Sequence, residues 1–111
     1  MGYSRAVVKG DWCFVSGVTG YDYATMTMPS GAADQARNCF ATIRRVLDEA
    51  GFTMSDIVRV QYTITERSLV DQIVPALAEN LGEIRPAATM VIAGLIQPEM
   101  LIEIEVTAMK A

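Results

Sequence analysis

The pattern of apolar and polar residues predicts two strands at the start of the chain. The segments 3–9 and 12–18 are short and largely apolar. Gly10-Asp11 lies between them and favours a tight hairpin turn. Ser16-Gly17 interrupts the second of these strands. A serine and a glycine there indicate a bulge or a close approach of another chain segment, or simply the end of the strand. A loop rich in Gly, Thr, Tyr and Met then follows over residues 19–31.

Two helices are predicted further along the chain. From residue 33 to 50 apolar side chains recur every three or four positions, and Gly51 follows where helices commonly end. Ser68 and Asp71 resemble the pair that caps the start of a second helix, which Gly82 would end. Pro75 is expected to kink this second helix or to delay its regular start. The expected apolar stripes are Ala36, Phe40, Ile43, Leu47 and Ala50 in the first helix and Val70, Val74, Leu77 and Leu81 in the second.

Three more strands complete the predicted domain. Residues 57–65 alternate, with Val58, Val60, Tyr62 and Ile64 expected on one face. Residues 85–95 are apolar almost throughout, which is typical of a strand covered on both faces. Residues 101–108 alternate strictly and align Glu103 with Glu105, after a turn that contains Pro98. The order strand, strand, loop, helix, strand, helix, strand, strand predicts one α+β domain over residues 1–111, with both helices on one face of the sheet.

The amino-acid composition limits which classes of function are possible. The chain has 111 residues, of which 51% are hydrophobic, so we expect part of its surface to be buried in an oligomer. The net charge of −4 argues against a nucleic-acid partner, and the absence of histidine excludes histidine-based catalysis and histidine metal sites. Cys13 and Cys39 lie among apolar residues and are expected to be buried and reduced. No segment resembles a membrane span or a secretion signal, so we expect a cytoplasmic protein.

Several short motifs, in order from end to end of the chain, resemble the RidA/YjgF family of reactive-intermediate deaminases. This resemblance implies a chorismate-mutase-like fold and a homotrimer with a barrel-like core, in which the uncovered sheet faces meet. It also implies a small-molecule site in each cleft between subunits. The activity implied is hydrolysis of enamine/imine metabolites, such as 2-aminoacrylate, to keto acids and ammonia without a metal or cofactor. The matching segments are Gly2-Tyr3, Val15-Ser16-Gly17, Gln35-Ala36-Arg37-Asn38, Asp56-Ile57-Val58-Arg59, Pro86-Ala87 and Ile102-Glu103-Ile104-Glu105.

The resemblance also implies roles for individual residues. Tyr3 would line the cleft, Ser16 and the Gly17 backbone would contact the substrate, and Arg59 would take the place of a pocket lysine. Glu103 corresponds to the glutamate that holds the attacking water.

The chain departs from the family pattern where the substrate carboxylate is bound. The family has an arginine two positions after the proline, and here the segment is Pro86-Ala87-Ala88. Met90 stands at the position usually taken by a cysteine-type residue, and the turn after Leu95 is one residue longer. Arg59 and Arg85 are the nearest arginines by sequence and register. Either could reach the cleft, and the alternative for each is a place on the surface or at the trimer interface.

Three functions follow from these residues. The first is an enamine/imine deaminase with Glu103 as its base, which acts poorly on 2-aminoacrylate because Ala88 replaces the arginine. The second is a trimer that binds a small metabolite without chemistry. The third is a ribonuclease or translation inhibitor, which the acidic charge and the lack of histidine make the least favoured.

Overall fold

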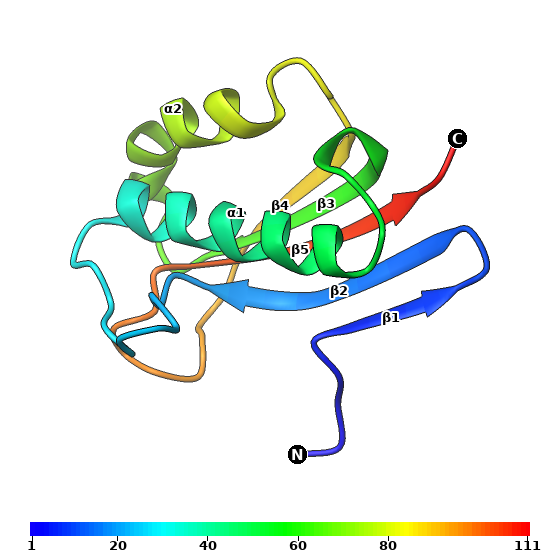
Figure 1. Ribbon diagram of the computed structural model, residues 1–111. Helices are drawn as coiled ribbons and strands as arrows, with labels where there is room; N and C mark the ends of the chain where they lie inside the picture. Colours follow the sequence, from blue (N-terminus) through cyan, green and yellow to red (C-terminus); the bar gives the residue numbers. More distant parts are fainter.

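The chain forms a five-stranded mixed sheet with two helices packed on one face (Figure 1). The computed structural model describes residues 1–111, and its strands lie in the order β1-β2-β5-β3-β4. All neighbouring strands are antiparallel except β3 and β4, so the predicted α+β class and mixed sheet are confirmed. The elements are β1 (Ala6–Lys9), β2 (Trp12–Thr19), α1 (Ala32–Glu49), β3 (Ile57–Ile64), α2 (Val70–Leu81), β4 (Ala87–Ile92) and β5 (Ile102–Met109), with short 3-10 turns at Met54–Asp56 and Arg67–Leu69.

The hairpin and the first helix form as the sequence predicts. Lys9 pairs with Trp12 across the two-residue turn, where Gly10 has a φ of 57° that favours glycine. The predicted α1 stripe from Ala36 to Leu47 is buried, and Gly51 follows the helix with a φ of 85°. Both predicted thiols, Cys13 and Cys39, are buried and unpaired.

The second helix differs from its prediction in two respects. Ser68 lies in the preceding 3-10 turn and makes no cap, and α2 begins at Val70 without a side-chain cap. The buried residues of α2 are Ile73, Ala76 and Leu81, whereas Val74 is 49% exposed. Of the predicted stripe, Leu81 is buried and Val70 and Leu77 pack partly buried against the core, so only Val74 is misplaced. Pro75 lies inside the helix, and Gly82 ends it as predicted.

Val58 of β3 also departs from the predicted alternation of buried and exposed residues. Ile57 pairs with Ala108 and Arg59 with Thr107, so two residues of β3 lie opposite one interval of β5. This irregularity buries Ile57 and leaves Val58 42% exposed, although alternation predicted Val58 in the core.

The prediction that the strand around Val91 and Ile92 is covered on both faces is wrong for the single chain. β4 lies at the edge of the sheet and all six of its residues are exposed. A continuous apolar run is typical of a central strand. Here β4 pairs with one strand only, β3, and the helices cover little of its surface.

The two faces of the sheet differ in cover. One face packs against α1 and α2 and supplies the core, with Val60, Ile64, Ile102 and Ile104 at its centre. The other face has no helix on it (Figure 1). No helix of the chain is both long and apolar enough to cross a membrane.

Candidate active site

A bulge in β2 brings Gly17 against Glu103. β2 and β5 pair Val15 with Val106 and then Val18 with Ile104, so β2 contains one extra residue at Ser16-Gly17. A Cβ atom on Gly17 would lie 2.5 Å from Oε1 of Glu103 and 2.6 Å from its Cδ. Of the alternatives open for Ser16-Gly17, the structure shows a bulge and not the end of the strand, and the group that lies against Gly17 is the Glu103 carboxylate.

Arg5 holds this bulge in place. Its Nη1 donates to the carbonyl of Gly17 at 2.8 Å and to that of Ser16 at 3.2 Å. The Ser16 hydroxyl donates to the carbonyl of Ser4, and the Ser16 amide donates to the carbonyl of Arg5. Sequence reasoning did not single out Arg5. The only feature of the sequence that could have indicated its role is its position just before β1, the strand that pairs with the bulged strand β2. A bulge leaves carbonyl groups that need hydrogen-bond donors.

The environment of Glu103 raises the pKa of its carboxyl group. Burial is the largest cause, the nearby charge of Glu105 adds to it, and Arg5 opposes both. On the uncovered face Glu103 lies between Thr19 of β2 and Thr63 of β3. A half-buried carboxyl group with a raised pKa suits a general base that must later return its proton.

The nearby thiol of Cys39 has no such reactivity. Cys39 lies in α1 beneath β2, and its Sγ donates to the carbonyl of Val18 at 3.2 Å. Burial, and then the charge of Glu103, raise the pKa of Cys39 to about 12, so the thiol stays protonated.

Arg59 shares the uncovered face but lies away from Glu103. Its Nη2 donates to Oγ1 of Thr89 at 2.9 Å. Thr63 is the residue of β3 that pairs with Glu103, and Arg59 lies four residues earlier, about 13 Å along the strand.

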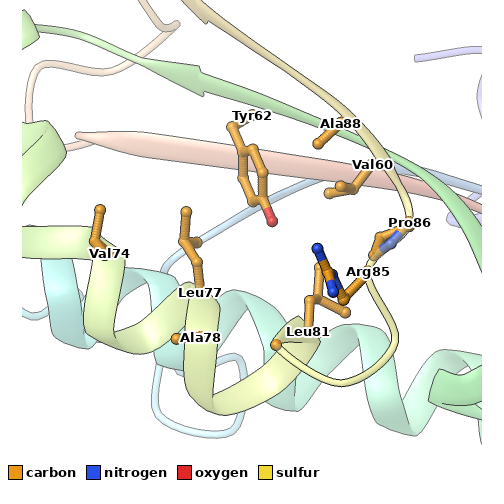
Figure 2. A pocket seen from close by; sticks show the side chains of 10 residues that line it. Val60, Tyr62, Val74, Leu77, Ala78, Leu81, Arg85, Pro86 and Ala88 are labelled. Carbon is orange, nitrogen blue, oxygen red and sulfur yellow. The ribbon is translucent and has the colours of Figure 1, made fainter.

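Arg85, Ala88 and Met90 belong to the opposite face of the sheet. Ala88 pairs with Val60 and Met90 with Tyr62, and both partners face the helices. Arg85 and Ala88 line an open pocket of about 380 Å³ between α2 and the β3–β4 pair (Figure 2).

The structure thus divides the predicted site residues into separate groups. Ser16, Gly17 and Glu103 lie together, whereas Arg85 and Ala88 lie across the sheet from them. Tyr3 precedes β1 and is 62% exposed. No group of three or more His, Cys, Asp or Glu side chains is placed to hold a metal ion.

Comparison with known proteins identifies the family. The model of the family described as Endoribonuclease L-PSP matches residues 1–110. The chain belongs to this family, which is that of RidA and YjgF.

Individual relatives agree with this assignment. A RutC family protein from Pyrococcus horikoshii is 29% identical over 109 residues, which cover 97% of this chain and 86% of the relative. The crystal structure of a YjgF/YER057c/UK114 family member from Mycobacterium tuberculosis is 34% identical with a TM-score of 0.88, over 98% of this chain and 87% of that one. RidA from the Antarctic bacterium Psychrobacter is 28% identical with a TM-score of 0.92, over 99% of this chain and 89% of that one.

Proposed function

We propose that the chain is a cofactor-independent enamine/imine deaminase that works as a homotrimer. It hydrolyses a small metabolite to a carbonyl compound and ammonia at a site between two copies. The observation that most supports this proposal is the Glu103 carboxyl group, which lies half-buried against Gly17 with a raised pKa. Family membership supports the same reaction class.

The exposed apolar surface supports self-association. Trp12 and Phe14 stack on the uncovered face with their ring centroids 6.2 Å apart, and they are 40% and 47% exposed. Ile92 of the edge strand β4 is 48% exposed. Apolar side chains gathered on a sheet face and along a bare edge mark an interaction surface. In the proposed trimer both are covered by neighbouring copies.

A second copy also explains why the predicted site residues are divided. β4 is an edge strand, so another chain can lie along it. That neighbour would bring its own Ser16, Gly17 and Glu103 to the pocket beside Ala88. Tyr3 would line the same cleft, and Arg85 and Met90 would border it from the β4 side, whereas Arg59 on the uncovered face would contact a neighbouring copy there.

The proposed reaction needs only a base and a water molecule. An enamine first takes a proton on carbon and becomes the protonated imine (iminium). Glu103 then removes a proton from the water as its oxygen attacks the imine carbon, and the C=N electron pair moves to nitrogen. Glu103 returns the proton to nitrogen, which makes it an ammonium leaving group. The C–N bond then breaks, ammonia leaves, and Glu103 takes the hydroxyl proton as the carbonyl forms. The raised pKa of Glu103 suits these proton transfers.

The replacement of the family's arginine by Ala88 favours one alternative, a trimer that binds a metabolite without converting it. Loss of a single binding cation on an intact scaffold is compatible with that function. The same experiment separates the two, because a binding protein would retain ligand affinity and show no turnover.

The test is a panel of imines generated by an amino-acid oxidase, with ammonia release followed in the presence and absence of the protein. We expect turnover that falls at least about 10²-fold in Glu103→Gln. Glu49→Gln, at the exposed end of α1, is the matched control and should act like the wild type. Turnover that is unchanged in Glu103→Gln would exclude the proposed base.

A further inference from the structure

The pocket beside Ala88 has mainly apolar walls. Val60 and Tyr62 of β3 form one side, Leu77 and Leu81 of α2 form the other, and Ala88 of β4 adds only a methyl group. Its volume of about 380 Å³ lies within the range of small-molecule sites. Because Ala88 faces this pocket, the family's arginine at the same position would extend into it, and its absence leaves that space open.

Two polar groups point into this apolar space. Figure 2 shows the Tyr62 hydroxyl and the Arg85 guanidinium directed toward each other between α2 and the sheet. The ion pairs of the chain are those of Arg37 with Asp34 and Glu79, so Arg85 has no carboxylate partner. Burial alone raises the pKa of Tyr62 to about 12, which keeps its hydroxyl protonated and able to donate.

The backbone fixes the position of Arg85. Its φ is 54°, in the left-handed region that non-glycine residues rarely adopt, and its amide donates to the carbonyl of Leu81 at 2.9 Å. Residues held in this conformation are enriched at ligand-binding sites. The turn after α2 therefore holds a free cation at the rim of an apolar pocket.

We propose that this pocket binds a small monocarboxylate with a branched or aromatic tail. The carboxylate lies between the Arg85 guanidinium and the Tyr62 hydroxyl, and the tail packs against Val74, Leu77 and Leu81. This inference rests on the proposed function, because it assumes that the acid is the substrate or product of the proposed deaminase site. It makes the chain selective for imines of bulky apolar amino acids over 2-aminoacrylate.

The arrangement of charge and apolar surface explains this selectivity. A charge-assisted hydrogen bond from Arg85 orients the acid, and the hydroxyl of Tyr62 adds a second donor. 2-Aminoacrylate has no tail to fill the space beside Ala88, so it gains little from the apolar wall. Each buried methylene group of a longer acid adds to affinity.

The test measures binding of product analogues by calorimetry. The probes are 4-methyl-2-oxopentanoate and phenylpyruvate as bulky acids, pyruvate as a small acid, and 4-methyl-2-pentanone as an uncharged ketone. We expect both bulky acids to bind roughly tenfold or more tightly than pyruvate, and more tightly than the ketone. Equal affinities for all four probes, or no binding, would overturn the proposal.

Variants separate the contributions of charge and tail. Arg85→Ala should weaken both bulky acids roughly tenfold or more and leave the ketone unchanged. Ala88→Leu should fill the pocket and remove the preference for bulky acids, and because the added side chain enters open space this variant should fold. Tyr62→Phe should weaken the acids several-fold. Arg67→Ala, at an exposed arginine outside the pocket, is the matched control. If Arg85→Ala and Arg67→Ala bind alike, Arg85 is not the carboxylate ligand.

Imine turnover measured on the same samples tests the binding-site proposal and the deaminase proposal separately. Tight binding of bulky acids without turnover of any imine would contradict the deaminase and leave the binding site. Turnover of small imines without preference for bulky ones would contradict the binding site and leave the deaminase.

Discussion

The Glu103 carboxyl group lies against Gly17, in the space that a side chain would occupy if residue 17 were not glycine. A Cβ atom at position 17 would be 2.5 Å from Oε1 of Glu103. The bulge of β2 and the strand β5 thus determine together where the carboxyl group lies. This relationship makes the position of the proposed base sensitive to a single methyl group.

Gly17→Ala should therefore reduce activity far more than stability. The added methyl group meets the Glu103 side chain, whose carboxyl end can move aside, so we expect about 1 kcal/mol of destabilisation, at the low end of the cost of overpacking. Displacement of a catalytic group by about 1 Å can cost about 10²-fold in rate. Imine turnover and thermal unfolding measure the two effects. Gly94→Ala is the control, since nothing lies within 4 Å of a Cβ there. A fully active Gly17→Ala would contradict the proposed site.

The raised pKa of Glu103 predicts the direction of a pH effect. The folded state holds this proton more tightly than the unfolded state, so the stability contribution of Glu103 falls as pH rises from the ordinary value of 4.5 through the raised one. Glu103→Gln should therefore raise the free energy of unfolding at pH 7, and the gain should disappear below about pH 4.5. Denaturant unfolding at several pH values measures it. A gain that does not change with pH would mean that the pKa is not raised.

Arg5→Met should loosen the bulge and shift Glu103. The variant removes the donor to the carbonyls of Ser16 and Gly17, which should cost about 1–3 kcal/mol. It also removes the charge that lowers the pKa of Glu103, so that pKa should rise further. Denaturant unfolding and NMR titration of the Glu103 carboxyl group test both expectations. Arg5→Lys should restore the pKa better than the stability, because it keeps the charge but not the fork of donors.

The uncovered face should join three copies. Light scattering coupled to size exclusion should give three times the chain mass of 12.1 kDa. Phe14→Asp should dissociate the trimer, because it places a charge in an apolar interface. Ile96→Asp, at a loop residue that is 83% exposed, should leave the assembly intact. A monomer at micromolar concentration in the wild type would contradict both the trimer and the shared site.

The wild type should be a poor 2-aminoacrylate deaminase. Ala88 provides no donor for the carboxylate of this substrate, and the Arg85 and Tyr62 donors proposed to replace the arginine hold an acid whose small tail leaves the space beside Ala88 unfilled. Loss of a buried charged partner costs about 3–5 kcal/mol, or roughly 10²–10⁴-fold in kcat/KM. Ala88→Arg should recover part of this activity, limited by Met90 and the longer turn. Wild-type rates equal to those of an arginine-containing relative would mean that Arg85 fully replaces the missing arginine for this small substrate, and would contradict the selectivity proposed for bulky acids.

The sequence by itself determined the order of the elements and most of their faces. The hairpin at Gly10, the α1 stripe that includes Phe40, and the alternation through Ile104 all form as predicted. Each depends on local backbone preference and on one repeat period, which residues close in sequence set. For Ser16-Gly17 the sequence left a bulge, a close approach and a strand end open, and the register of β2 with β5 shows the bulge.

Only the tertiary structure decided how the candidate site is divided. Glu103 and Ala88 lie on opposite faces of one sheet, a relation that follows from register across three strands and from no local pattern. Tertiary packing likewise placed Arg5 at the bulge, turned Val58 out of the core and left β4 at an exposed edge. These outcomes depend on which segments meet in space, and contacts between residues far apart in sequence are not set by the periodicity of either segment.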